Sequence, residues 1–217
     1  MKSRPAPKRR RVIRRLDNDE RRAQLLALGR AAFTSHSYDE VSIDELAKKA
    51  KISKGLFYYY FPTKRELYIA GLTETAQELV AKLTATANKD LSPRDRASAS
   101  IDAYLEHVGS QSSGFVALMR GGIGSDPQVG AVLEGVRKSI LDEFMAGAPI
   151  AQFLKARPLS RIAIRSWIGM VEAASIEWLS SREISRIAVR DLLVDMLFDM
   201  LLRVLDPSDA ARYASDP

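Results

Sequence analysis

The sequence of 217 residues contains no cysteine, which excludes two kinds of site. Without cysteine there is no disulfide framework, and no thiolate can bind a metal. The two histidines, His36 and His107, lack the spacing of metal ligands. This composition is compatible with a reducing cytoplasm, so we expect a cytoplasmic protein without a metal site.

Long apolar runs and strand-like patterns are also absent. No run of about 18 uncharged apolar residues is present, so we expect no membrane-spanning helix. The basic N-terminus has no apolar segment after it and does not resemble a secretory signal. Periodic segments have helical spacing, and none alternates as a strand would. Because 46% of the residues are apolar, the chain can bury a substantial core, and we predict an all-α fold.

Signals for catalysis are weak. The glycine-rich run 121–124 neither follows a strand nor carries the lysine or acidic residue that nucleotide-binding loops require. The acidic residues fall mostly at expected helix starts or on solvated faces. We therefore expect no enzymatic activity and no cofactor.

The positive charge is concentrated in residues 1–16. This segment carries eight lysines and arginines and no acidic residue, whereas the rest of the chain has 25 basic and 27 acidic residues. Its prolines argue against regular structure. It is either a solvated, disordered tail or an arm, including Arg14 and Arg15, that contacts DNA phosphates or the minor groove. We favour the arm because of the segment that follows it.

A basic and aromatic segment spans residues 41–65. Ser42 to Glu45 has the pattern of a capping box, which predicts a helix start. Ser53 can cap a second short helix, and Phe61-Pro62 would end it, because the residue before proline avoids the helical region. Two short helices joined by a tight turn are typical of a helix-turn-helix.

The second short helix has one apolar and one polar side. Phe57 and Phe61 are spaced i, i+4 and should share a buried face. Tyr58 and Tyr59 should then point outward. Residues 48–65 contain six basic side chains and no acidic one, so the outward face suits a polyanion.

These residues resemble the DNA-binding domain of the TetR family of bacterial transcriptional regulators. The resemblance covers about residues 21–72, and its joint pattern is specific. It is carried by Ser42, Ala47, Ala50, Ser53-Lys54-Gly55, Tyr58, Phe61, Pro62, Lys64 and Leu67. Lys51 and Ser37 stand where the family usually has glycine, which would cost roughly 1 kcal/mol at each position if the backbone is left-handed.

The resemblance implies two groups of DNA contacts. Phosphate contacts that set the register are expected from Ser42, Ser53, Tyr58, Tyr59 and Lys64. Base contacts are expected from the start of the recognition helix, at Lys54, Gly55 and Leu56. Leu56 replaces the family's usual small polar residue, which favours contact with a thymine methyl group.

The periodic pattern divides the chain into several further helices. They are expected at about 17–35, 64–87, 93–108, 115–120, 127–144 and 160–179, with a last helix that starts at a capping box at 180–183 and ends near 205. The stretch 192–205 is apolar except for three residues, so a second copy of the chain should cover it. Charged substitutions at Leu197 and Leu201 should therefore dissociate or unfold the protein.

Together these signals predict four segments. They are a disordered basic arm (1–16), a helix-turn-helix domain (17–65), a larger helical domain for ligand binding and dimerisation (66–206), and a flexible tail (207–217). The resemblance implies a small-molecule pocket in the larger domain. Its candidate lining is Tyr104, His107, Phe115, Met119, Phe144, Trp167, Met170 and Glu172, although for each residue taken singly ordinary core is the favoured interpretation.

The prediction is a homodimeric repressor that binds a palindromic operator and is released by a small-molecule effector. Two alternatives stay open. The first is a ligand-independent DNA-binding activator or an architectural protein. The second is a helical enzyme, or a protein that uses its basic arm on an anionic membrane surface.

Overall fold

The computed structural model describes residues 17–86, 91–120, 122–146, 154, 157–181 and 183–205. Within these residues it contains only helices, which confirms the all-α prediction. They are α1 (Asn18–Ser35), α2 (Ile43–Ala50), α3 (Lys54–Tyr60), α4 (Lys64–Ala85), α5 (Pro93–Ser110), α6 (Ser112–Arg120), the 3-10 helix η1 (Gly122–Ser125), α7 (Pro127–Ala146), α9 (Pro158–Ser180) and α10 (Arg186–Val204). The predicted arm 1–16 and tail 207–217 lie outside the described residues.

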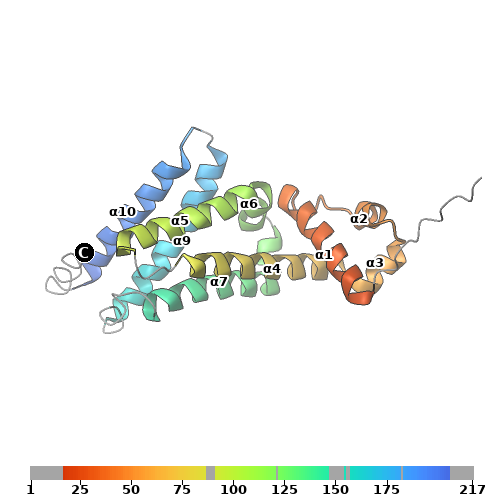
Figure 1. The fold of residues 1–217 in the computed structure, drawn as a ribbon, viewed down its shortest axis with the longest axis horizontal. Helices are drawn as coiled ribbons and strands as arrows, with labels where there is room; N and C mark the ends of the chain where they lie inside the picture. The colour runs from red at the N-terminus through yellow and green to blue at the C-terminus, as the bar shows by residue number, and fades with distance from the viewer. Residues whose placement is uncertain are drawn as a thin grey trace, which may run out of the picture.

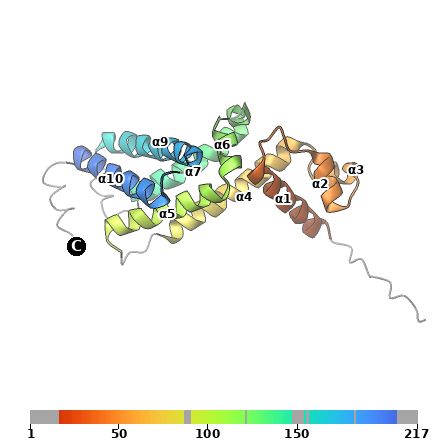
Figure 2. The same ribbon diagram turned by 90° about the horizontal axis from the view of Figure 1, so that it is seen from above.

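The molecule is elongated, with a small three-helix unit at one end. Figure 1 shows α1, α2 and α3 together at that end, where α4 begins. α4 then continues into the larger bundle and packs against α1, α5 and α7. Both views place α9 and α10 side by side in the part of the bundle remote from the three-helix unit (Figures 1 and 2). The structure thus matches the predicted order of a small domain followed by a larger helical one.

Local sequence signals explain how the small domain folds. Asp17 caps α1 and forms a reciprocal capping box with Glu20, whose backbone N–H donates to the Asp17 carboxylate at 2.7 Å. Gly29 lets α4 approach α1, since a Cβ at this position would lie 2.9 Å from the Leu67 side chain. Phe57 is buried beneath α3, together with Phe61. The predicted apolar face of the recognition helix is confirmed.

The turn between α2 and α3 carries backbone strain. Lys51 ends α2 in the left-handed region, with φ 56° and ψ 44°. It is the single non-glycine residue with positive φ in the described part of the chain. A side chain in this region costs about 1 kcal/mol relative to glycine. The expected strain is therefore present at Lys51 and does not arise at Ser37.

One predicted capping box and two predicted helix starts differ from the structure. Ser42 precedes α2, but its side chain makes no capping hydrogen bond, so the expected capping box is absent. α6 begins at Ser112 rather than Phe115, because the Phe115 N–H already donates to the Gln111 carbonyl at 2.8 Å and closes the first turn.

The start of α10 is the third difference. The expected capping box at 180–183 is not formed, and Ser185 caps the helix by accepting from the Ala188 N–H at 3.2 Å. The Trp178 indole N–H donates to the Ile184 carbonyl at 3.1 Å. This tertiary hydrogen bond holds the residue before the cap outside the helix, so α10 starts later than the local pattern indicated.

The apolar residues of α10 fall into two sets. Leu197 and Leu201 are buried in the core that α10 shares with α5 and α9, where the Trp167 indole N–H also donates to the Leu193 carbonyl at 3.0 Å. Charges at Leu197 or Leu201 would therefore unfold the protomer and would not test dimerisation. Leu192 and Met196 are exposed instead, as are Ile187 and Leu202, and these are residues of α10 that a second copy could cover.

Candidate nucleic-acid interface and ligand cavity

The recognition helix α3 is held from one side and exposed on the other. Ser53 caps it by accepting from the Leu56 N–H at 3.1 Å, as predicted. Phe57 is fully buried, whereas Leu56 is 42%, Tyr58 37% and Tyr59 69% exposed. A helix that shows two tyrosines and a leucine to solvent has a surface available for a partner.

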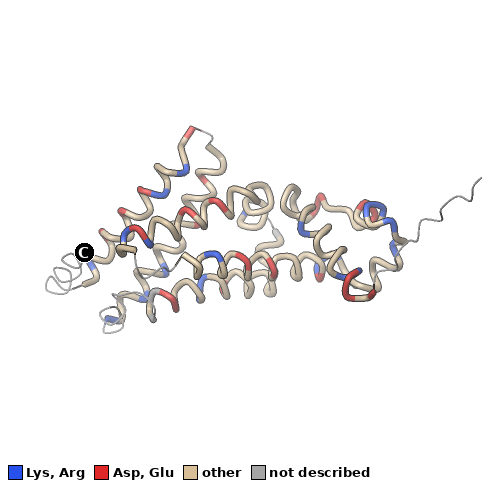
Figure 3. The backbone as a smooth tube through the Cα atoms, in the orientation of Figure 1, with Lys and Arg blue, Asp and Glu red and all other residues tan. Residues whose placement is uncertain are grey.

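The start of α3 combines an ion pair with an open backbone. The Lys54 ammonium lies 2.9 Å from a carboxylate oxygen of Asp44 on α2, and this hydrogen bond raises the pKa of Lys54. Figure 3 shows basic and acidic residues close together around this turn. A Cβ at Gly55 would meet no atom within 4 Å. The protomer's own packing therefore does not require a glycine there.

Lys64 is used inside the small domain. Its ammonium donates to the backbone carbonyls of Asp39 at 3.3 Å and Val41 at 3.2 Å, and lies 4.5 Å from the centre of the Tyr38 ring. These contacts tie the loop before α2 to the first turn of α4. Any phosphate that Lys64 binds would share the ammonium with these two carbonyls.

Tyr60 adds a contact that the sequence pattern did not single out. Its hydroxyl donates to the side-chain carbonyl of Asn18 at 3.1 Å, and its ring meets that of Tyr59 edge-on, with centroids 5.2 Å apart. Asn18 is the first residue of α1, directly after the predicted arm. The end of the recognition helix is thereby fixed next to the point where the arm joins the domain.

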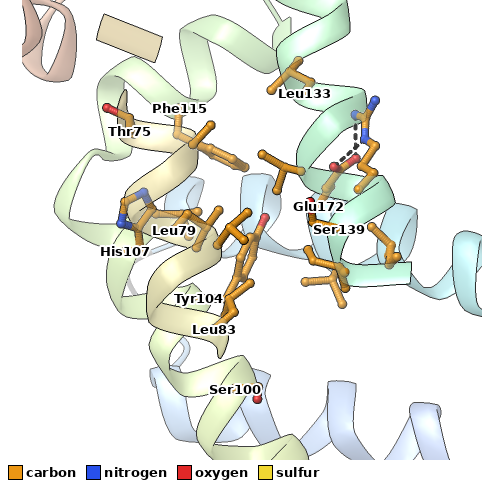
Figure 4. A pocket seen from close by; sticks show the side chains of 18 of the residues that line it. Thr75, Leu79, Leu83, Ser100, Tyr104, His107, Phe115, Leu133, Ser139 and Glu172 are labelled. Atoms are coloured by element: carbon orange, nitrogen blue, oxygen red, sulfur yellow. Dashed lines mark hydrogen bonds and ion pairs between the residues drawn. The ribbon is translucent and has the colours of Figure 1, made fainter. Parts of the chain in front are cut away.

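A cavity of about 900 Å³ lies in the larger domain, between α4, α5, α6, α7, α9 and α10, and it reaches α1. This volume is at the upper end of the range of small-molecule sites. Six of the eight residues proposed from the sequence line it: Tyr104, His107, Phe115, Met119, Trp167 and Glu172. Several of these surround the space shown in Figure 4. The side chain of Phe144 lies outside the described part.

Met170 is not brought to the cavity. It packs against the hydrophobic core, while its neighbour Val171 lines the cavity. Successive residues of an α-helix differ in direction by roughly 100°, so Met170 can point away from the cavity while Val171 and Glu172 line it. Local sequence could not distinguish them, because both are apolar residues of one predicted helix.

An ion pair crosses the cavity wall from α7 to α9. Arg137 holds both carboxylate oxygens of Glu172, at 2.7 and 2.9 Å, and this hydrogen bonding raises the pKa of Arg137. Glu134 lies 3.5 Å from Arg137 and accepts from Arg165 at 2.9 Å. The wall therefore contains one carboxylate–guanidinium pair, Glu172 with Arg137, and a second pair, Glu134 with Arg165, lies behind it.

Two buried titratable groups face the cavity in uncharged form. Burial raises the pKa of the Tyr104 phenol, and its hydroxyl has no hydrogen-bond partner among the described residues. Burial lowers the pKa of His107, and the nearby Lys82 charge lowers it further. One ring nitrogen of His107 lies 3.2 Å from the side-chain nitrogen of Gln111. Both groups are neutral at pH 7.

A second ion pair joins the two domains. The Arg65 guanidinium, in the first turn of α4, holds both carboxylate oxygens of Asp126, at 2.6 and 2.8 Å. Arg65 lowers the pKa of Asp126 to about 2. The same carboxylate accepts from the Gln128 N–H at 2.9 Å and so caps α7. The cap of a cavity helix is thus bonded to the helix that follows the recognition unit.

Comparison with known proteins assigns each domain. Residues 25–70 match the model for bacterial regulatory proteins of the tetR family, and residues 93–200 match that for the tetracyclin repressor-like C-terminal domain. A crystal structure of a TetR-family transcriptional regulator from Streptomyces coelicolor is 30% identical, with a TM-score of 0.76, over 93% of this chain and 91% of that one. The chain belongs to the TetR family.

Other similar proteins match over part of the chain or at lower identity. The transcriptional activator FasR of Mycolicibacterium smegmatis is 30% identical over 128 residues, which is 59% of this chain and 58% of FasR. The chain therefore spans less than two thirds of that curated relative. FadR of Bacillus subtilis, solved in complex with stearoyl-CoA, has a TM-score of 0.61 at 13% identity, over 81% of this chain and 96% of FadR. At this identity the likeness shows the fold alone.

The TetR-family assignment identifies the protein as a DNA-binding transcriptional regulator and α3 as its recognition helix. The match to the C-terminal model begins at Pro93, the first residue of α5, so most of the cavity lies within it. Sequence reasoning missed the Arg65–Asp126 and Arg137–Glu172 pairs, because their partners are far apart in the chain. None of the described helices could span a membrane.

Proposed function

We propose that this protein is a homodimeric repressor that a small molecule releases from a palindromic operator. The observation that carries the proposal is the position of α4. Its first turn holds the recognition unit through Lys64, and its later residues, from Tyr68 to Thr84, line the cavity. A ligand that displaces α4 would therefore change the orientation of the recognition helix.

On DNA, the exposed side of α3 would enter the major groove. Gly55 would let the backbone approach the bases, and Leu56 would contact a thymine methyl group. Ser42 makes no capping bond, so its hydroxyl is available for a phosphate. Ser53, Tyr58, Tyr59 and Lys64, together with Arg14 and Arg15 of the arm, would supply further phosphate contacts.

The dimer would form through α9 and α10. Exposed apolar side chains on these helices include Ile162, Leu192, Met196 and Leu202. Gly169, in the middle of α9, has open space where a Cβ would be. An apolar surface around an open glycine suits close packing against a helix of a second copy.

Release would run through α4 and α7 together. α7 contributes Leu133 and Arg137 to the cavity, and the carboxylate that caps α7 is bonded to Arg65 at the start of α4. A ligand that separates α7 from α4 would change this contact. Arg65→Gln should therefore weaken the response to ligand more than it weakens binding to DNA.

A second candidate function is transcriptional activation. It is favoured by the partial match to FasR, which is named as an activator. The two functions share one DNA-binding surface and differ in the effect on RNA polymerase. In vitro transcription would separate them, from a template that carries an operator recovered by selection from a random duplex pool. A repressor lowers the transcript level, and an activator raises it.

DNA binding itself should be tested against the alternative of membrane binding. We expect the full-length protein to bind a palindromic duplex far more tightly than a scrambled duplex or vesicles with anionic lipid. Equal affinity for the vesicles and the palindrome would contradict the proposal.

A further inference from the structure

The shape and wall chemistry of the cavity indicate the class of its ligand. Its lining runs along α4 from Tyr68 to Thr84, a distance of about 24 Å at the helical rise of 1.5 Å per residue. Leucine, isoleucine, valine and aromatic side chains make up most of this lining. A long, mainly hydrocarbon molecule fits such a space.

The charged residues of the lining balance one another. Three arginines and three carboxylates line the cavity: Arg30, Arg96, Arg137, Asp142, Glu143 and Glu172. Arg30 is bonded to Glu74 at 3.1 Å and to Glu78 at 2.5 Å, and Arg137 is bonded to Glu172. The Arg96 guanidinium is bonded to the Leu91 carbonyl rather than to a carboxylate, and its Nε is buried without a partner among the described residues. Arg96 lies eight residues before Tyr104 on α5, about 12 Å along the helix. An ionised ligand in the middle of the cavity, away from Arg96, would lose its hydration without gaining a free countercharge.

Tyr104 supplies a polar group that lacks a partner in the middle of the cavity, as the Arg96 Nε does at its α4–α5 end. The residue is 8% exposed, and its hydroxyl makes no hydrogen bond among the described residues. The Ser175 hydroxyl nearby donates to the Val171 carbonyl at 2.7 Å. In Figure 4 the Tyr104 hydroxyl points into the central space, and Glu172 lies on the far wall. A buried hydroxyl without a partner costs free energy, which a ligand oxygen can recover.

Glu172 selects the kind of oxygen. Its carboxylate accepts from Arg137 and retains further lone pairs, and its negative charge acts on the Tyr104 phenol. A hydroxyl group can accept from Tyr104 and direct its own hydrogen towards the negative charge of Glu172 on the opposite wall. A carboxylate in the same place would be repelled by Glu172.

We propose that the cavity binds an uncharged long-chain alcohol whose hydroxyl lies near mid-chain, between Tyr104 and Glu172. The lining of α5 and α6 runs from Pro93 to Met119, so Tyr104 lies close to its middle and apolar surface extends in both directions. The proposed ligand class rests on the proposed function, because the ligand of this cavity would be the effector that releases the protein from DNA.

Calorimetric titration of the full-length protein with matched probes tests this inference. Undecan-6-ol should bind at least tenfold more tightly than undecanoate at pH 7.5, and undecan-1-ol and undecan-6-one should fall between them. Lengthening the mid-chain alcohol should strengthen binding by about fourfold per CH₂ group until the cavity is full. Undecanoate that binds as tightly as undecan-6-ol would overturn the proposal, as would the absence of binding by every probe.

Tyr104→Phe gives the residue-level test. It should weaken undecan-6-ol binding by about five- to tenfold, the value of one hydrogen bond, without lowering the melting temperature. The matched control is Tyr68→Phe, which removes the same atom near the α1 end of the cavity and should leave the alcohol affinity unchanged. Equal loss in both variants, or no loss in Tyr104→Phe, would refute the assignment.

An ionic head group is the competing interpretation, and Arg96 is where it would bind. The Arg96 guanidinium donates to the Leu91 carbonyl at 3.1 Å, at the α4–α5 end of the cavity. Suppose that undecanoate is the tightest probe and that Arg96→Gln weakens its binding more than it weakens the binding of undecan-1-ol. The ligand would then be an anion, and the proposal would be wrong. All titrations omit DNA, so a failure of bound alcohol to release DNA would count against the proposed function alone.

Discussion

Replacing Gly55 by alanine separates what the fold needs from what DNA binding needs. Gly55 lies in the first turn of α3, and a Cβ there would meet no atom of the protomer within 4 Å. Alanine in place of glycine within a helix stabilises it by about 0.5–1 kcal/mol, because the unfolded chain has less freedom to lose. The free protein should therefore be slightly more stable.

The same methyl group should weaken DNA binding. If the start of α3 packs closely against the base edges, an added methyl group overpacks that interface at a cost of about 1–3 kcal/mol. This corresponds to a loss of affinity of about 5- to 150-fold. A Gly55→Ala variant that is more stable but binds DNA more weakly cannot owe its weaker binding to misfolding.

The assay combines thermal unfolding of the free protein with fluorescence anisotropy on a labelled operator. Gly135→Ala is the matched control, because Gly135 is an exposed glycine of α7 whose Cβ would also meet no atom within 4 Å. We expect the control to gain similar stability and to bind DNA as the wild type does. If Gly55→Ala binds the operator with unchanged affinity, the close approach of α3 to DNA is wrong.

Four further outcomes are expected. Leu56→Ala should change the preference at one base position per half-site by about 1–3 kcal/mol in a binding-site selection, and an unchanged profile would rule out base contact by Leu56. Deleting residues 2–15 should reduce the slope of log affinity against log salt by about 0.9 per lost phosphate contact, with an unchanged melting temperature; identical slopes would identify a passive tail. Leu192→Asp combined with Met196→Asp should give folded monomers in sedimentation, whereas the exposed turn variant Leu91→Asp should stay dimeric; a dimer in both would place the interface elsewhere. Asp126 has a folded-state pKa of about 2 against an ordinary 3.8, so the stability difference between wild type and Asp126→Asn should be complete above about pH 4 and disappear as the pH falls towards 2; a pH-independent difference would contradict this.

The small domain could be predicted well because its signals are local. The cap of α3 at Ser53, its end before Pro62 and the buried spacing of Phe57 and Phe61 each depend on neighbours within a few residues. The capping-box pattern of residues 63–66 located the start of α4, which the structure shows from Lys64 to Ala85 with Thr63 as its cap. Such patterns survive folding because the same residues decide both the helix and its buried face.

The errors arose where tertiary contacts outweigh local pattern. Ser185 caps α10 in place of the expected box because Trp178 holds Ile184 outside the helix. α6 includes Gly114, although glycine is a weak helix former. Only glycine fits at this position, because a Cβ would lie 2.3 Å from the Phe33 carbonyl oxygen. That close approach of α6 to α1 could not be read from either segment alone.

The lining of the cavity was predicted in part from the sequence, but the contacts within it were not. Tyr104 and Glu172 were expected to line a pocket, and both do. The partner of Glu172, Arg137, is 35 residues away in the sequence, and no local pattern connects them. Likewise, the apolar surface of α10 was recognised, but which of its leucines face the protomer core depends on how α5 and α9 pack.

Selection of bound sequences from a random duplex pool tests the central claim most directly. The full-length protein should enrich a palindrome of two half-sites about one helical turn apart, because each protomer of a dimer places one recognition helix in the major groove. Recovery of a single unpaired half-site would contradict the dimer. Recovery of no enriched sequence would contradict the account of α3 as a sequence-reading helix.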